Sequence, residues 1–151
     1  MLVIVGALIA FSLPAITNLS RSAALPGALR QVYNEASLAR QYAITHRVQT
    51  ELIVSNSLSA VTVSNLSAGV LLDKWNYLPV GTIVYFDPTV FNTVCVTNLV
   101  FTPTGGTTNL NEVSICVREG SFENNVYFGI NSNMGTITIN NLMGRIAIQR
   151  P

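Results

Sequence analysis

Met1–Ile16 reads MLVIVGALIAFSLPAI, a run with no charged residue and almost no polar group. The rest of the chain is polar and rich in Asn, Thr and Ser, and it is patterned for strands. This contrast predicts a subunit whose apolar N-terminal helix lies in a membrane at one stage and packs against copies of itself at another. We therefore divide the chain into an apolar membrane or filament-core helix segment over 1–24 and a globular head over 25–151.

The apolar segment has three possible interpretations: a membrane or assembly helix, a signal peptide, or an ordinary core helix. A signal peptide carries Lys or Arg ahead of its apolar stretch, whereas the first basic residue here is Arg21. A helix of sixteen residues spans about 24 Å, less than the roughly 30 Å of a bilayer's hydrocarbon core. We favour a membrane or assembly helix that lacks its first turn or two.

Gly6 and Pro14 weaken this helix, because Gly costs about 1 kcal/mol and an interior Pro about 3 kcal/mol relative to Ala. Two such positions in one helix allow local melting, with the freed backbone groups covered inside a protein bundle. A simple kink at Pro14 is the alternative. In both cases Gly6 and Pro14 are the expected positions of helix flexibility.

Charged residues make up 10% of the 151 residues, and the net charge is +1. The basic residues form no contiguous stripe, so bulk electrostatics do not support nucleic-acid binding, and nucleic acid is an unlikely partner. Lys and Glu, which keep cytosolic proteins soluble, are scarce, and we expect an extracellular or periplasmic setting. The basic positions are Arg21, Arg30, Arg40, Arg47, Lys74, Arg118, Arg145 and Arg150.

Leu25-Pro26-Gly27 predicts a second break, followed by an amphipathic helix over 27–47. The apolar face follows the helical period and narrows to Ala, so that a sheet can approach closely. Glu35 and Arg40 are expected on the opposite, polar face. The helix should end near His46-Arg47, whose side chains suit the negative end of its dipole. The apolar face comprises Leu25, Leu29, Val32, Ala36, Ala39 and Ala43.

Short runs of β-branched residues between Asn, Ser, Gly and Pro clusters predict strands after the helix. Asn140–Gly144 predicts a hairpin connection, in which Gly144 can adopt a positive φ at little steric cost. Gly105-Gly106 predicts another turn. The predicted fold class is α+β, with a long N-terminal helix packed on an antiparallel β-sheet head. The expected strands are Val48–Val54, Ala60–Leu66, Ala68–Trp75, Thr82–Phe86, Thr93–Phe101, Glu112–Arg118, Val126–Ile130, Thr136–Ile139 and Arg145–Gln149.

Cys95 and Cys116 each lie in a predicted strand. Strand alternation places both thiols on the polar face of their strand, where a free thiol would be exposed. Outside the cytoplasm they should pair across neighbouring antiparallel strands. A disulfide that closes a loop of about 22 residues would contribute roughly 3 kcal/mol. Two unlinked thiols are the alternative.

Catalytic chemistry finds little support. The only histidine, His46, lies at the predicted helix end. A Cys–His nucleophile pair with Cys95 or Cys116 remains a formal possibility, as does a secreted enzyme with a signal peptide. The seven Asp and Glu residues form no cluster, and no phosphate-binding glycine loop or zinc-ligand spacing occurs. We therefore expect no enzymatic activity, no metal and no cofactor.

An apolar helix with Gly6 and Pro14, an amphipathic continuation and a β-rich head together resemble the bacterial type IV pilins and pseudopilins. The spacing from Gly6 to Pro14 matches the glycine and proline of the pilin N-terminal helix. By that alignment the sequence begins about eight residues inside the family's conserved start. The upstream stretch would hold the methylated N-terminal residue and the glutamate that guides subunit docking. The sequence is therefore either trimmed or that of an atypical member.

The head is similar to the FimT/GspH type of minor pilins and pseudopilins. Ala36–Ile44 resembles their Ala-Arg-x-x-Ala-Ile helix end, Val100–Gly105 their Phe-x-Pro-x-Gly turn, and Gly144-Arg145 part of their final hairpin. DNA-uptake members carry Gly-Arg-x-Arg near the C-terminus, whereas this chain has Ala147 in place of the second Arg. Arg145 and Arg150 are the possible DNA contacts.

The resemblance implies a structural subunit of an extracellular type IV pilus-like or pseudopilus filament. A minor pilin or pseudopilin at a filament tip, acting in DNA uptake or type II secretion, is the alternative. The implied partners are copies of the chain in a helical filament, the inner membrane before assembly and the inner-membrane pilus assembly machinery. The residues expected to pack in the filament core are Leu2, Val3, Val5, Leu8, Ile9, Phe11 and Leu13.

Overall fold

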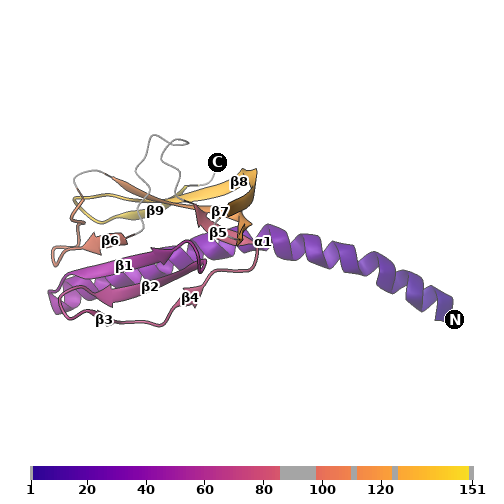
Figure 1. The fold of residues 1–151 in the computed structure, drawn as a ribbon, viewed down its shortest axis with the longest axis horizontal. Helices are drawn as coiled ribbons and strands as arrows, with labels where there is room; N and C mark the ends of the chain where they lie inside the picture. Colours follow the sequence, from indigo (N-terminus) through magenta and orange to yellow (C-terminus); the bar gives the residue numbers. More distant parts are fainter. Residues whose placement is uncertain (1, 86–97, 110–111, 124–125, 150–151) are drawn as a thin grey trace.

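The helix α1 (Leu2–His46) runs the length of the molecule, and two antiparallel sheets pack on its C-terminal half (Figure 1). The structure is a computed structural model that describes residues 2–85, 98–109, 112–123 and 126–149, with the backbone alone for 2–23, 85, 121–123 and 126–133. The N-terminal half of α1 projects from the head as a single rod. No helix within the described part of the chain is long and apolar enough to cross a membrane.

The predicted break at Leu25-Pro26-Gly27 is wrong, because α1 is continuous through all three residues. The helix contacts the head there: Leu25 is buried, and a Cβ on Gly27 would lie 3.6 Å from Cγ of Pro79. Packing of a buried face stabilises a helix in a protein more than residue propensity does. It offsets the backbone hydrogen bond that Pro26 cannot donate.

The apolar face predicted from the helical period is confirmed. All six of its residues are buried in the head, together with Ala28. The helix ends at His46, as predicted. Arg47 then takes a positive φ of 54°, after which the chain enters β1 (Thr50–Ser55).

The first sheet contains β1 and four further strands, in the order β3-β2-β1-β6, with β4 pairing with β2 as well. All of its pairs are antiparallel. The register places Leu52 of β1 between Val63 of β2 and Leu99 of β6, and all three side chains are buried. The bounds of these strands are β2 (Ala60–Asn65), β3 (Val70–Leu71), β4 (Asn76–Tyr77) and β6 (Asn98–Phe101).

The second sheet has the order β5-β7-β8-β9. Ile137 of β8 pairs with Ile115 of β7 on one side and with Ile148 of β9 on the other. A register shift between Arg118 and Gly120 interrupts the ladder of β7 and β8. The bounds are β5 (Thr82–Tyr85), β7 (Val113–Glu123), β8 (Val126–Ile139) and β9 (Ile146–Gln149).

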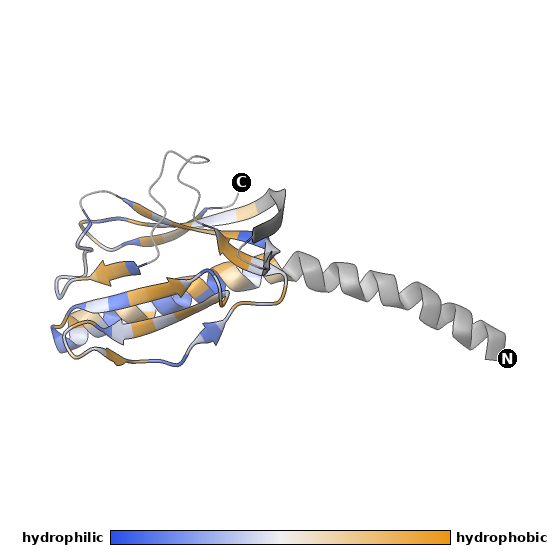
Figure 2. Cartoon of the chain, viewed as in Figure 1, coloured by the Kyte–Doolittle hydropathy of each residue, from blue (hydrophilic) through white to orange (hydrophobic). Residues whose placement is uncertain are grey.

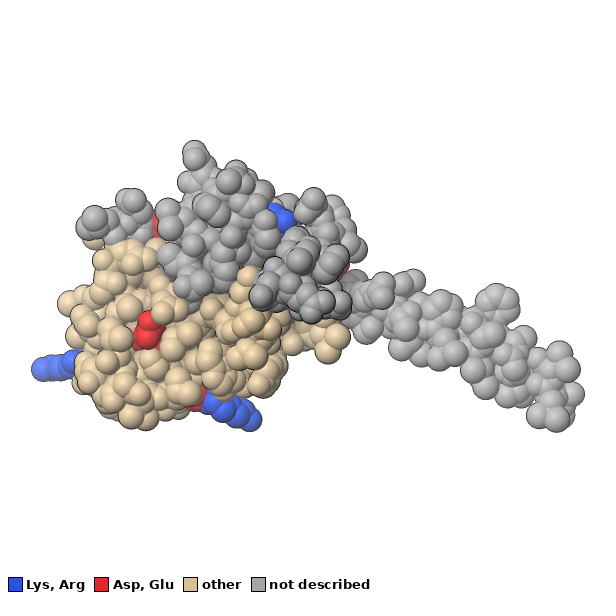
Figure 3. Space-filling view, viewed as in Figure 1, with Lys and Arg blue, Asp and Glu red and all other residues tan. Residues whose placement is uncertain are grey.

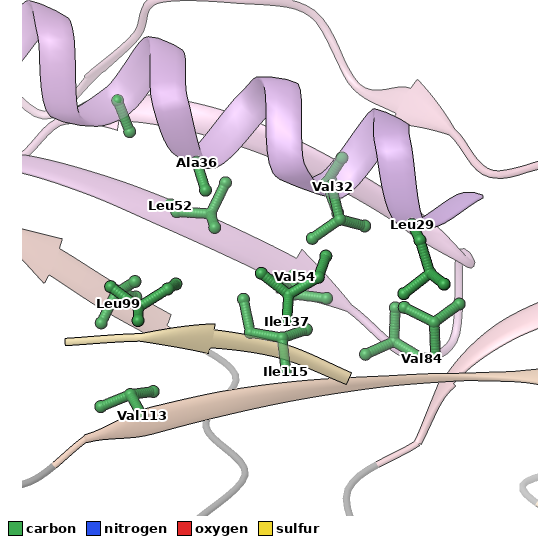
Figure 4. Packing of buried hydrophobic residues seen from close by; sticks show 14 of the residues in the cluster. Leu29, Val32, Ala36, Leu52, Val54, Val84, Leu99, Val113, Ile115 and Ile137 are labelled. Atoms are coloured by element: carbon green, nitrogen blue, oxygen red, sulfur yellow. The ribbon is translucent and has the colours of Figure 1, made fainter. Parts of the chain in front are cut away.

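The core lies where α1 faces both sheets (Figure 4). Apolar and polar residues alternate along several of the described strands (Figure 2), which turns one face of each toward the core. The helix contributes Leu29, Val32 and Ala36, among others, and these point toward side chains of both sheets. The labelled strand residues of this cluster are Leu52, Val54, Val84, Leu99, Val113, Ile115 and Ile137.

The prediction of one strand over Ala68–Trp75 is wrong. Pairing with β2 is limited to β3, after which the amides of Leu72 and Asp73 both donate to the carbonyl of Val63, at 2.8 and 3.4 Å. Two donors on one acceptor end the regular ladder. The chain returns to β2 only at β4, which the sequence pattern did not predict.

The predicted hairpin at Asn140–Gly144 is confirmed as the connection between β8 and β9. The separate strands predicted at Val126–Ile130 and Thr136–Ile139 are instead one strand, β8, because pairing with β7 continues on both sides of the polar residues between them. The part of the predicted strand Thr93–Phe101 before Asn98 lies outside the described residues, as does Phe86.

Candidate functional site

Arg40 of α1 joins the helix to two loops that are distant in sequence. Its Nε donates to the carbonyl of Gly105 at 3.1 Å, and its Nη2 donates to the carbonyl of Met143 at 2.9 Å. Arg40 is half-buried outside the apolar face of the helix, as the helical period predicts, and its guanidinium fork bonds two backbone carbonyls. The three head motifs of the sequence, which contain Arg40, Gly105 and Gly144, meet at this junction.

Glycines allow the two loops to touch. Gly105 and Gly144 have positive φ angles of 86° and 59°, and a Cβ on Gly144 would overlap the carbonyl oxygen of Gly105. A Cβ on Gly106 would lie 2.7 Å from the carbonyl oxygens of Asn141 and Leu142. A larger residue at Gly144 or Gly106 would force the loops apart.

A groove of about 610 Å³ opens beside Arg40, between α1 and the start of β9. Arg145, one of the two possible DNA contacts, is exposed and lines it, whereas Arg150 lies outside the described residues. The lining contains two cations and no acidic side chain, so the groove favours an anionic or polar group. The lining residues are Tyr33, Ser37, Arg40, Gln41, Met143, Gly144, Arg145 and Ile146.

Charge is sparse on the face drawn in Figure 3, where the described Lys and Arg residues lie at separate points. This agrees with the absence of a basic stripe in the sequence. Arg118, by contrast, is buried in β7.

Glu35 is buried, although the sequence pattern places it on the polar face of the helix. The segment after β3 crosses α1 and covers the side chain of Glu35. Nδ2 of Asn76 donates to Oε1 of Glu35 at 2.7 Å and to Oδ2 of Asp73 at 3.0 Å. Burial and the negative charge of Asp73 raise the pKa of Glu35 above its usual value of 4.5, and the hydrogen bond from Asn76 lowers it in part. The sequence contained no periodic signal for this crossing.

Cys116 is buried on β7, which corrects the expectation of an exposed thiol. Its strand lies between β5 and β8, and residues on both of its faces are buried, Ile115 on one and Ser114 on the other. A central strand of a covered sheet has no solvated face. The predicted disulfide involves Cys95, which lies outside the described residues, so the pairing stays a prediction.

His46 is exposed at the end of α1. Its ring stacks on that of Tyr42 with centroids 3.9 Å apart, and its Nδ1 lies 3.3 Å from the carbonyl oxygen of Tyr42. These contacts belong to the last turn of the helix. Among the described residues, no group of three or more His, Cys, Asp or Glu side chains is placed to hold a metal ion.

The backbone of the predicted filament-core residues lies in the projecting part of α1 and is helical throughout, including Gly6 and Pro14. The side chains of this part are not described, so the seven packing positions and the two flexible positions stay predictions. The buried residues that α1 contributes to the core run from Leu25 to Ala43. The head therefore packs on the second half of the helix.

A long helix whose second half packs on two antiparallel sheets defines the pilin fold, and this chain has that fold. It is similar to the type IV minor pilin FimU of Pseudomonas aeruginosa strain PAO1 in two crystal forms. The TM-scores are 0.62 and 0.59, each at 14% identity; the matches cover 88% and 83% of this chain and 92% of the FimU chain in each form.

The chain is also similar to the minor pseudopilin EpsH from the type 2 secretion system of Vibrio cholerae, with a TM-score of 0.57 at 14% identity. That match covers 85% of this chain and 98% of the EpsH chain. No family model matches the sequence, and no curated protein matches it either. Because the sequence identity is only 14%, this structural likeness establishes the fold alone.

Proposed function

We propose that this chain is a structural subunit of an extracellular type IV pilus-like or pseudopilus filament and acts by assembly, without catalysis. The observation that carries the proposal is the projecting half of α1, a continuous helix that extends beyond the head (Figure 1). Its sequence contains no charge before Arg21. The likeness to a minor pilin and a minor pseudopilin supports this role.

The free-energy cost of exposing apolar side chains to water explains why the projecting helix needs lipid or other helices around it. Burying one Val, Leu, Ile or Phe side chain contributes about 1.5–3 kcal/mol relative to water, so exposing all seven would cost roughly 10–20 kcal/mol. Lipid covers them while the subunit waits in the inner membrane, and sister helices cover them after the assembly machinery extracts it. Small residues at Gly6, Ala7 and Ala10 allow the helices to approach closely. The seven residues are Leu2, Val3, Val5, Leu8, Ile9, Phe11 and Leu13.

The flexible joint at Gly6 and Pro14 belongs to this proposal. The backbone of the single chain is helical at both positions. Local melting in the packed filament would allow sister helices to adjust to one another, and the bundle would cover the freed backbone groups.

The substitution Leu8→Asp tests the proposal. A carboxylate in an apolar helix bundle costs several kcal/mol, because it loses its hydration without gaining a partner. We expect cells that express the full-length variant to lose surface filaments, measured by electron microscopy and by immunoblotting of sheared filaments. The melting temperature of the head should stay unchanged.

The matched control is Asn18→Asp, which adds the same charge at a position that is already polar and should keep filament yield normal. Filaments of normal abundance from Leu8→Asp would show that the helix does not pack in a filament core.

A rare, minor subunit is the second candidate, alongside an abundant one. The observation that favours it is that both FimU and EpsH are named as minor components. Quantitative mass spectrometry of purified filaments distinguishes the two: a minor subunit would be far less abundant than the main filament protein, whereas an abundant subunit would itself be the main component.

A further inference from the structure

The head carries an apolar hollow beside the point where α1 leaves it. This neck hollow has a volume of about 320 Å³ and no charged residue in its lining. Val80 is 99% exposed, Tyr77 65% and Leu58 48%, so three large apolar side chains stand in solvent around it. Apolar side chains that are exposed together beside a hollow mark a candidate interaction surface. The connection between β4 and β5, which contains Val80, forms one wall.

A second apolar surface lies on the turn between β8 and β9. Leu142 is 81% exposed and Met143 73%. The turn is held rigidly: Oδ1 of Asn140 accepts hydrogen bonds from the amides of Leu142 and Met143, each at 3.1 Å, and Arg40 binds the carbonyl of Met143. Leu142 and Met143 therefore form a fixed apolar knob, and little ordering entropy would be lost if it docked.

The two surfaces lie at opposite ends of the head. Gly27, at the level of the neck hollow, is close to Pro79, while Arg40 binds the knob. These helix residues are thirteen positions apart, which is about 20 Å along α1. Figure 1 agrees: the β4–β5 connection lies beside the emerging helix, and the β8–β9 turn lies at the far end. Knob and hollow therefore cannot meet within one molecule.

We propose that the Leu142–Met143 knob of one copy docks into the neck hollow of another copy along the filament. The inference rests on the proposed function and adds a contact between heads to the helix bundle. A contact between two different surfaces of the same chain is heterologous, and such contacts repeat into open helical assemblies when the rotation does not close. The occupant is a second copy because the hollow adjoins the projecting helix, which the proposed assembly also covers with sister chains.

Charge reversal across the contact tests the proposal in the full-length protein. Val80→Lys alone and Leu142→Glu alone each place an unpaired charge in an apolar contact, and each should lower the yield of sheared filaments about tenfold or more. The double variant restores complementarity between neighbouring copies and should recover most of the wild-type yield. Both side chains are largely exposed, so the head should fold normally, as its melting temperature would verify.

Val70→Lys and Leu66→Glu are the matched controls, since both residues are exposed apolar side chains outside the two surfaces. They should leave filament yield unchanged, singly and together. Normal yield from either test variant, or a double variant no better than the worse single one, would overturn the contact between heads. Such a result would leave the helix-bundle role intact, whereas a wild-type protein that forms no filament would refute the proposed function itself.

Discussion

Glu35 is a buried carboxylate that burial and Asp73 make costly to ionise. Its Oε2 has no hydrogen-bond partner among the residues that the structure describes. Because folding raises its pKa, the folded state holds this proton more tightly than the unfolded chain does. The contribution of Glu35 therefore favours folding below pH 4.5 and is lost as the pH rises through the folded pKa.

We therefore expect Glu35→Gln to raise the melting temperature at pH 7, because glutamine keeps the acceptor for Asn76 and carries no charge. The gain should shrink as the pH falls below 4.5, where Glu35 is protonated in both states. Circular dichroism melts at several pH values measure this. Glu51→Gln, which also removes one negative charge, is the control. A lower melting temperature for Glu35→Gln at pH 7 would mean that the charged form is stabilised.

Alanine substitutions at Gly144 and Gly69 distinguish the cost of backbone strain from the cost of steric overlap. Both have similar positive φ angles, 59° and 66°, but nothing lies within 4 Å of a Cβ on Gly69, whereas a Cβ on Gly144 meets Gly105. Gly69→Ala should cost about 1–2 kcal/mol from strain alone. Gly144→Ala should cost about 3 kcal/mol or more, because the two loops must also separate. Chemical denaturation measures both, and equal losses would mean that the loops yield freely.

At the scale of elements, α1 approaches the sheets through small residues. Ala36, Ala39 and Ala43 are fully buried. Ala39→Leu would insert three carbons into this packed contact and should lower the free energy of unfolding by about 1–3 kcal/mol. Gln41→Leu places the same side chain on the exposed side of the same helix turn and should change it by less than about 0.5 kcal/mol. If the two variants unfolded alike, the helix would not be tightly packed at Ala39.

The sequence predicted the elements whose signal is local and periodic. The buried face of α1, its end at His46 and the hairpin at Asn140–Gly144 all follow from repeat spacing or turn chemistry. The predicted helix break at Leu25-Pro26-Gly27 was wrong because the helix packs on the head at that point, and helix propensity takes no account of such tertiary packing. The prediction of an exposed Cys116 thiol was wrong because the alternation of polar and apolar residues cannot distinguish a strand with one covered face from a strand with two.

At the scale of the whole molecule, the candidate site depends on contacts between distant parts of the chain. Arg40 is 65 residues from Gly105 and 103 residues from Met143. The motifs that contain Arg40, Gly105 and Gly144 could each be recognised in the sequence, but their meeting could not, because it depends on the order of strands in two sheets. The same applies to Glu35 and Asn76, and to the knob and the neck hollow.

The two sheets share a single core, because one buried cluster joins α1 to strands of both. The side chains of this cluster pack together across α1 and both sheets, so the head should unfold in one cooperative transition. Leu52→Ala in the first sheet and Ile115→Ala in the second should each lower the free energy of unfolding by about 2–5 kcal/mol and move that same transition. Trp75, the only tryptophan, lies between β3 and β4 of the first sheet, so its fluorescence reports on that side, while far-ultraviolet circular dichroism reports on both. If Ile115→Ala shifted the circular dichroism transition and left the Trp75 transition in place, the sheets would be separate folding units and α1 would only connect them.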